Sequence, residues 1–262
     1  MKKKEGIEYL EKNQDEESSR YIFFLHGYGA NAQDLSGFHT LKLSRPCRWI
    51  FPNGPLELDT PYNLFGGRAW FPLKIKAANN QLHTNEQSLY YLKKHCQQLL
   101  HFISSFKLYR SGIEKRESFR DSVPRGEEKK RPENQALVEA GINQMGIKSD
   151  QIILGGFSQG AIMALNTALR MNPPPLALVL MSGAFFPAEI LDKNKQMYSK
   201  GGRFFQCHGK TDPLLSYSES KEVHSFLQDL QWKGKFLSFE GGHEIPHVVL
   251  LQIQEFINHT LS

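Results

Sequence analysis

The stretch from Gln151 to Met171 constrains the fold of this chain more than any other part of the sequence. A predicted strand, Gln151 to Leu154, precedes Gly156-Phe157-Ser158-Gln159-Gly160, and a helical pattern runs from Gln159 to Met171. A serine flanked by glycines between a strand and a helix is typical of a sharp turn that exposes the hydroxyl, because glycine keeps Cβ atoms out of the crowded backbone. Strand–turn–helix units of this kind build mostly parallel sheets with crossover helices.

The same alternation of apolar runs and helical patterns recurs along the chain. Further strands are predicted at Tyr21 to Leu25, Arg48 to Phe51, Leu176 to Met181, Arg203 to Cys207 and Lys235 to Phe239. Further helices are predicted at Asn85 to about Phe106, Asn134 to Met145, Ser218 to Gln231 and Pro246 to Asn258. We therefore expect residues 1–262 to form a single α/β domain, with six strands in one open, mostly parallel sheet flanked by helices.

Residues 107–133 differ in composition from the rest of the chain. They carry nine Lys or Arg and six Asp or Glu, a net +3 of the +5 on the whole chain, and show no apolar periodicity. We expect a mobile loop here. A basic loop can favour anionic surfaces such as lipid headgroups, but mixed charges with Gly and Pro more often form a solvated excursion.

Cysteine usage and the N-terminal residues indicate a compartment. Cys47, Cys96 and Cys207 are odd in number and widely spaced, with no CxxC motif and no metal-binding spacing, which favours reduced thiols and no metal site. Residues 5–20 are polar and charged where a signal peptide needs an apolar run, and no stretch approaches the length of a membrane span. We expect a cytoplasmic protein.

A reactive serine needs a base that takes its proton and an acid that orients the base. His243 follows the last predicted strand in Glu240-Gly241-Gly242-His243-Glu244, where two glycines give the backbone freedom to swing the imidazole over the carboxyl edge of the sheet. Asp212 follows the strand predicted at Arg203 to Cys207. The order Ser158, Asp212, His243 is the one expected of the α/β-hydrolase fold.

Asp212 also has a competing structural interpretation, because an Asp before a Pro commonly stabilises a turn. Its position at the end of a strand, between the serine and the histidine in the chain, favours the catalytic interpretation. Asp150 precedes a strand, at the opposite edge of the sheet, and Asp192 has no strand directly before it. Both are weaker candidates for the acid.

The loop Leu25-His26-Gly27-Tyr28-Gly29-Ala30 follows the first predicted strand. In folds of this class such a loop supplies a second backbone donor to an oxyanion, so the backbone amides of Tyr28 and Gln159 are the candidate oxyanion donors. An ordinary glycine turn is compatible with the same pattern. Four apolar residues near Gly66 and Gly67 can form a wall of the substrate-binding cleft or an ordinary part of the core: Leu64, Phe65, Trp70 and Phe71.

Together these motifs resemble the phospholipase/carboxylesterase family that includes the acyl-protein thioesterases. The matching stretches are Phe24-Leu25-His26-Gly27-Tyr28-Gly29, Pro52-Asn53-Gly54-Pro55, Arg68-Ala69-Trp70-Phe71, Ile152-Ile153-Leu154-Gly155-Gly156-Phe157-Ser158-Gln159-Gly160, His208-Gly209-Lys210-Thr211-Asp212-Pro213 and Gly242-His243. The resemblance implies an α/β-hydrolase fold without a large lid domain, with Trp70 in a loop that lines the substrate cleft. It also implies a triad of Ser158, Asp212 and His243.

The chain departs from the family pattern in two places. Family members usually have a second glycine where this chain has Ala161, a mild change because the position is already helical. The helix at residues 85–106 and the charged residues after it resemble an insertion at about 81–133. An insertion folded over the cleft would change the substrate range that the family implies.

These observations predict a serine hydrolase that cleaves carboxylic esters or thioesters through an acyl-enzyme, with no metal or organic cofactor. Expected substrates are small-molecule, lipid or other acyl esters and acylated proteins, with no nucleic-acid partner and no transmembrane segment. Transient contact with a membrane surface and a homodimer stay open. The alternatives are a lysophospholipase-like esterase recruited to membranes by the basic loop, and a non-catalytic binding protein with the same fold.

Overall fold

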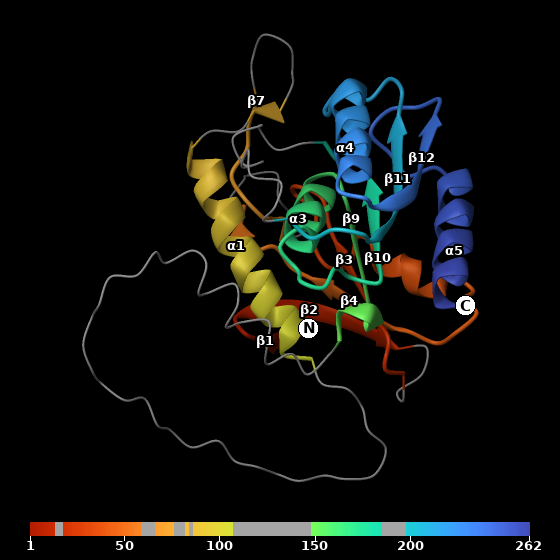
Figure 1. Ribbon diagram of the computed structural model, residues 1–262. Helices are drawn as coiled ribbons and strands as arrows, with labels where there is room; N and C mark the ends of the chain where they lie inside the picture. Colours follow the sequence, from red (N-terminus) through yellow and green to blue (C-terminus); the bar gives the residue numbers. More distant parts are fainter. Residues whose placement is uncertain (14–17, 59–65, 76–81, 84–85, 107–147, 185–197) are drawn as a thin grey trace, which may run out of the picture.

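The computed structural model describes residues 1–13, 18–58, 66–75, 82–83, 86–106, 148–184 and 198–262. A central eight-stranded sheet organises them, in the order β1-β2-β4-β3-β9-β10-β11-β12 (Figure 1). The six strands from β4 to β12 run parallel, while β1 and β2 are antiparallel at one edge. The strands are β1 (Lys2–Lys4), β2 (Ile7–Asn13), β3 (Tyr21–Leu25), β4 (Arg48–Pro52), β9 (Ile152–Phe157), β10 (Ala177–Met181), β11 (Arg203–Gly209) and β12 (Lys233–Phe239).

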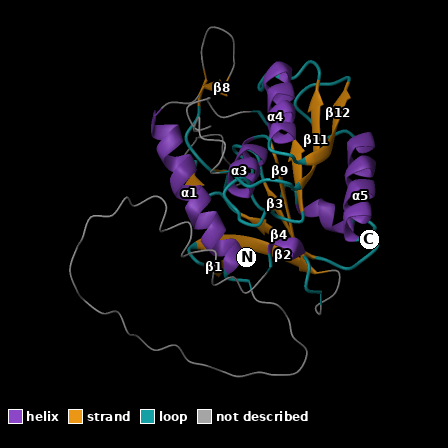
Figure 2. Ribbon diagram, viewed as in Figure 1, coloured by secondary structure: helices purple, strands orange, loops and turns teal. Residues whose placement is uncertain are grey.

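Helices cover both faces of this sheet (Figure 2). One face carries α1 (Glu86–Ser104), α3 (Gln159–Ala168) and α4 (Tyr217–Asp229), and the other carries α5 (His247–Leu261) and the 3-10 helix η1 (Ser36–Thr40). The short 3-10 helix η2 (Ser149–Gln151) leads into β9. Two small antiparallel pairs lie outside the central sheet: β5 (Leu56–Glu57) with β6 (Arg68–Ala69), and β7 (Lys74–Ile75) with β8 (Leu82–His83).

Alternating side chains of the central strands supply two separate hydrophobic cores. In β3, Phe23 and Leu25 belong to the core beneath α1 and α3, while Ile22 and Phe24 belong to the core beneath α5. Because both faces of a parallel strand are buried, its sequence is apolar throughout instead of alternating with polar residues. The uninterrupted apolar run at residues 21–25 follows from this arrangement.

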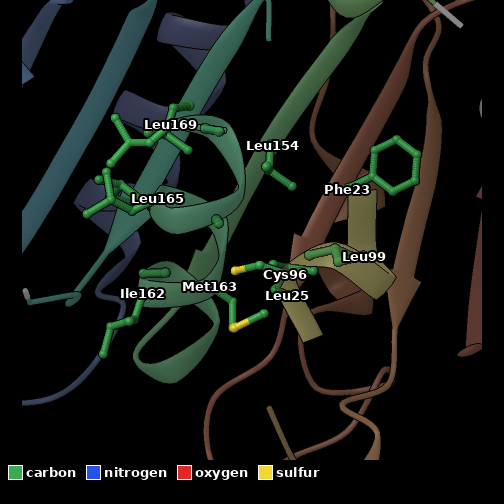
Figure 3. Packing of buried hydrophobic residues seen from close by; sticks show 14 of the residues in the cluster. Phe23, Leu25, Cys96, Leu99, Leu154, Ile162, Met163, Leu165 and Leu169 are labelled. Atoms are coloured by element: carbon green, nitrogen blue, oxygen red, sulfur yellow. The ribbon is translucent and has the colours of Figure 1, made fainter. Parts of the chain in front are cut away.

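Helix α1 is part of the first core. In Figure 3, Cys96 of α1 lies close to Leu25 of β3 and Met163 of α3, and all three belong to one buried cluster. The buried residues of α1 follow helical spacing along one stripe: Ser88, Leu92, His95, Cys96, Leu99, Phe102 and Ile103. The helix therefore covers the sheet beside α3.

The six predicted strands are all present, and their ends differ from the predicted ends by at most three residues. The same holds for the four predicted helices that fall on described residues. The helix predicted at Asn134 to Met145 and the charged loop at residues 107–133 lie outside the described residues. Strand β9 is longer than predicted, because Gly155 and Gly156 still pair with β3 and β10.

The prediction of six strands is wrong, since the sheet has eight. Strand β1 consists of three lysines, and in β2 only Ile7 and Tyr9 are buried among charged neighbours. An edge strand with a single short apolar face gives a weak sequence pattern, and charges are common on such edges. One of those charges, Glu11, is itself held in place by the Arg48 guanidinium of β4.

Among the described residues, no helix has both the length and the apolar character that crossing a membrane requires.

Candidate active site

Ser158 occupies the turn between β9 and α3 with a φ of +56°, a left-handed value that residues with side chains rarely adopt. A Cβ atom on Gly156 would lie 2.4 Å from the carbonyl carbon of Gly160, and one on Gly160 would lie 2.0 Å from the carbonyl oxygen of Leu25. Neither position can hold a larger residue without moving backbone. The predicted reason for the two glycines is confirmed.

The side chains of Ser158, His243 and Asp212 form one hydrogen-bonded chain at the carboxyl edge of the sheet. The Nε2 atom of His243 lies 2.8 Å from Oγ of Ser158, and its Nδ1 atom lies 2.6 Å from Oδ2 of Asp212. Because an ionised carboxylate only accepts hydrogen bonds, Nδ1 carries the proton and Nε2 is left to accept from the serine hydroxyl. This tautomer is the one that can take the serine proton.

Four nitrogen atoms surround the carboxylate of Asp212. The backbone amides of Leu214 and Leu215 donate to Oδ1 at 2.8 and 3.0 Å, while Oδ2 faces His243 and lies 3.3 Å from Nε2 of His208. Burial would raise the pKa of Asp212, but hydrogen bonds from His208, His243 and the Leu215 amide outweigh it and hold the pKa well below its usual range. One oxygen therefore stabilises the turn before the helix, and the other meets the histidine.

His208 is the residue of this site that the sequence interpretation missed. Its ring is fully buried, and Nε2 also lies 3.0 Å from the carbonyl oxygen of Leu215. The motif that contains Asp212 begins with His208, four residues earlier, so the residue was visible in the sequence. Its contact with the carboxylate depends on how the chain turns after β11.

The loops after β11 and β12 are tied together, which brings Asp212 to His243. The amide and hydroxyl of Thr211 both donate to the carbonyl oxygen of Gly241, at 3.1 and 2.9 Å. A Cβ atom on Gly209 would lie 2.2 Å from the carbonyl oxygen of Gly242, so only glycine permits this approach. Neither Gly241 nor Gly242 has a positive φ, so the expected gain in backbone freedom is not their role.

The ring of Phe157, the residue before Ser158, packs against the imidazole of His243. Its centroid lies 4.8 Å from that of His243. Phe157, the residue between the glycine and the serine of the motif, thus contacts His243 directly and restricts the orientation of the imidazole.

The two candidate oxyanion amides flank the serine. Gly27 packs against Ser158, since a Cβ atom on Gly27 would lie 3.4 Å from the Cβ atom of Ser158, and Tyr28 follows directly. Gln159 is the first residue of α3, where backbone amides carry partial positive charge. Among the described residues, neither the Tyr28 nor the Gln159 amide has a hydrogen-bond acceptor. Both donors are free to bind a ligand oxygen.

The apolar residues predicted to line the cleft behave differently. Trp70 and Phe71 have no exposed surface and belong to the core beneath α1 and α3, so burial favours the core interpretation and gives them no surface for a substrate. Leu64 lies outside the described residues. Among the described residues, Tyr28 and Leu214 are exposed hydrophobic side chains on the loops that carry the candidate site residues, at 43% and 37% exposure.

No cluster of three or more His, Cys, Asp or Glu side chains able to hold a metal ion occurs within the described part of the chain.

The chain is similar to esterases and thioesterases in sequence. It is 26% identical to acyl-protein thioesterase 1 of Candida albicans over 254 residues, which span 92% of each chain. It is 32% identical to lysophospholipase-like protein 1 of Mus musculus over 117 residues, 43% of this chain and 48% of the mouse protein.

Solved structures share the fold at lower identity. A carboxylesterase from Bacillus cereus superposes with a TM-score of 0.64 at 14% identity, covering 97% of this chain and 94% of the other. Acyl-protein thioesterase 2 from Zea mays superposes with a TM-score of 0.61 at 18% identity, covering 97% and 99%. Both neighbours show that the fold is that of the α/β-hydrolases.

The family model for Phospholipase/Carboxylesterase matches residues 8–104 and 121–261. The matched residues include α1 and leave only 105–120 between the two segments, which is a smaller candidate insertion than the expected one at about 81–133. Since the match covers most of the chain, this protein belongs to the phospholipase/carboxylesterase family.

Proposed function

We propose that the protein is a serine hydrolase that cleaves carboxylic esters or thioesters, with Ser158 as nucleophile, His243 as general base and acid, and Asp212 as the orienting acid. The observation that carries the proposal is the continuous chain of hydrogen bonds from Ser158 Oγ through His243 to Asp212, with distances of 2.8 and 2.6 Å. Membership of an esterase and thioesterase family supports it independently.

In the first half of the reaction, Oγ of Ser158 attacks the carbonyl carbon of the substrate while its proton passes to Nε2 of His243. The carboxylate of Asp212 stabilises the imidazolium that forms. The negative charge on the former carbonyl oxygen is bound by the backbone amides of Tyr28 and Gln159, close to the N-terminus of α3. As the carbon–oxygen or carbon–sulfur bond breaks, the leaving alcohol or thiol takes the proton from His243 and the acyl-enzyme remains.

In the second half, His243 removes a proton from water, which attacks the acyl carbonyl carbon. The tetrahedral intermediate collapses, Ser158 recovers its proton from His243, and the carboxylic acid leaves. Every group in the cycle belongs to the chain, to the substrate or to water, and the proposal requires no metal or organic cofactor.

The proposed location is a reducing compartment such as the cytoplasm. The three cysteines are free thiols and are all buried. Burial raises the pKa of Cys47 and Cys207 to about 12, which keeps these thiols protonated and unreactive.

Labelling with a fluorophosphonate tests the nucleophile. The expected result is a single adduct on Ser158 by peptide mass spectrometry, and no adduct in Ser158→Ala. A folded wild-type protein that takes no label, and hydrolyses none of the substrates below, would instead be a non-catalytic binding protein.

A comparison of substrates tests the class of ester. Turnover is measured on nitrophenyl esters of increasing chain length, on an acyl-thioester and on lysophospholipid micelles. Preference for the soluble ester or thioester supports the proposal. A preference for micelles supports the second candidate, a lysophospholipase-like esterase, which the similarity to the mouse protein and the basic residues at 107–133 favour.

A further inference from the structure

Trp70 lies between the two backbone segments that carry the candidate oxyanion amides. Its backbone N–H donates to Oε1 of Gln159 at 2.8 Å, and its indole Nε1–H donates to the carbonyl oxygen of His26 at 2.9 Å. One buried residue therefore bonds to the start of α3 and to the loop after β3 at the same time. These are the segments on the two sides of Ser158.

The side chain of Gln159 makes two hydrogen bonds to the segment that contains Trp70. Oε1 of Gln159 accepts from Trp70, and Nε2 of Gln159 donates to the carbonyl oxygen of Phe71 at 2.7 Å. Because the donor and the acceptor of the amide are both engaged, the side chain cannot flip without losing both bonds. Gln159 is 1% exposed, so water does not compete for these groups. The residue whose backbone amide faces the oxyanion is thus fixed through its side chain.

The loop after β3 is held on both sides of Tyr28. Before it, the His26 carbonyl accepts from the Trp70 indole. After it, the amide of Gly29 donates to the carbonyl oxygen of Arg68 at 2.9 Å, and the amide of Arg68 donates to that of Ala30 at 2.8 Å. The segment from Arg68 to Phe71 therefore holds the loop on both sides of the peptide that carries the Tyr28 amide.

His26 itself is locked beneath this loop. Its Nε2 atom accepts from the backbone amide of Gly54 at 2.9 Å, so the proton resides on Nδ1, which lies 2.7 Å from the carbonyl oxygen of Gly27. Burial lowers the pKa of His26 to about 4, so the ring is neutral at neutral pH and keeps this pair of bonds. The anchor for the indole does not change with small shifts of pH.

We propose that Trp70 is a positioning residue that sets the separation of the Tyr28 and Gln159 amides. This inference rests on the proposed function. Donors stabilise an oxyanion only when they are already placed at hydrogen-bond distance from it, and an error of about 1 Å can cost about 10²-fold in rate. Trp70 has no exposed surface, so it acts on the reaction through the two amides rather than by touching the substrate.

Trp70→Phe is the sharpest test, because it keeps a buried ring and the backbone N–H and removes the indole N–H. We expect kcat to fall about tenfold to 100-fold with KM within about twofold, since the loss is confined to transition-state binding. A trifluoromethyl ketone, which forms a tetrahedral adduct with Ser158, should lose affinity by the same factor. A substitution that only disturbed packing would lower thermal stability and leave the ketone affinity and kcat at their wild-type values.

Trp49→Phe is the matched control. Trp49 is also fully buried, but it lies in the other core, and its Nε1 atom has no hydrogen-bond partner among the described residues. We expect kcat and ketone affinity to remain within twofold of wild type. If Trp70→Phe fails to fold, Gln159→Met replaces it, because that change breaks both side-chain bonds and keeps the backbone amide.

The outcomes separate the two proposals. Wild-type protein that neither hydrolyses esters nor takes a fluorophosphonate on Ser158 overturns the proposed function and this inference with it. Wild-type activity, combined with Trp70→Phe and Gln159→Met variants that keep kcat and ketone affinity, leaves the hydrolase intact and reduces Trp70 to an ordinary core residue.

Discussion

Two neighbouring strands of the sheet, β9 and β10, are each followed by a serine with a positive φ. Phe157 and Met181 are paired in the register of the sheet, and the residues after them, Ser158 and Ser182, have φ values of +56° and +46°. Oγ of Ser158 lies 2.8 Å from a histidine nitrogen. Oγ of Ser182 is buried and has no hydrogen-bond partner among the described residues.

The difference shows what a strained serine at a strand end requires before it can act as a nucleophile. Left-handed backbone alone does not supply reactivity, because a hydroxyl is a weak nucleophile until an adjacent base takes its proton. The loop after β12 places His243 against Ser158. Ser182 stays at zero exposure, where its backbone amide donates to the Cys207 carbonyl oxygen.

The largest expected effect is on kcat, and it should appear when the hydroxyl of Ser158 is removed but not when that of Ser182 is removed. Ser158→Ala should lower kcat on a short ester by about 10⁶-fold, because the acyl-enzyme cannot form. Ser182→Ala, the matched control, should keep kcat within about twofold. Steady-state kinetics on the two purified variants decides the matter, and substantial turnover by Ser158→Ala would break the assignment of the nucleophile.

The next largest effect concerns Asp212, the proposed acid, which contacts the histidine beside Ser158. Asp212→Asn should lower kcat by about 10⁴-fold, because an amide nitrogen facing Nδ1 of His243 favours the tautomer whose Nε2 carries a proton and cannot accept one from Ser158. Asp34→Asn, at an exposed position, should have no effect. Equal kinetics for the two variants would remove Asp212 from the mechanism.

A smaller effect concerns the glycine beside the second serine. A Cβ atom on Gly183 would lie 2.7 Å from the Cβ atom of Ala161, so Gly183→Ala should lower the free energy of unfolding by about 1–3 kcal/mol. In an Ala161→Gly background the contact disappears, and the same change should cost less than about 0.5 kcal/mol. Denaturant unfolding of the four proteins measures the coupling. Additive costs would show that the two positions do not meet.

The smallest effect is on stability alone. Ser182→Ala removes a buried hydroxyl without a partner and leaves the backbone strain in place, so the free energy of unfolding should rise by up to about 1 kcal/mol. Urea unfolding at neutral pH measures the change. A clear loss of stability would mean that this hydroxyl has a partner in solution and that the contrast with Ser158 is weaker than the structure indicates.

The local sequence pattern was sufficient to predict those features of the site that depend on residues adjacent in the chain. Gly156 is required by its approach to Gly160 within one strand–turn–helix unit, whereas Gly160 is required by its approach to Leu25 of β3. The rule that parallel strands bring their carboxyl ends to one edge was sufficient to expect Ser158, Asp212 and His243 near one another. Strands β3, β4, β9 and β10 were recognisable because burial on both faces leaves short apolar runs in the sequence. The edge strand β1 and its neighbour β2 lack such runs and were not predicted.

Contacts between distant segments were decided only by the tertiary structure. The sequence marked Trp70 as an aromatic residue near the site, but burial under α1 and bonds to His26 and Gln159 place it in the core. Gly209, not the glycines before His243, is the residue that allows the catalytic loops to meet. Sequence spacing reports which residues share a turn, a strand or a helix, whereas burial and hydrogen-bond partners depend on which elements pack together. The sequence therefore singled out Ser158 as the candidate nucleophile, and the packing of the loops around it determined which side chains lie against it.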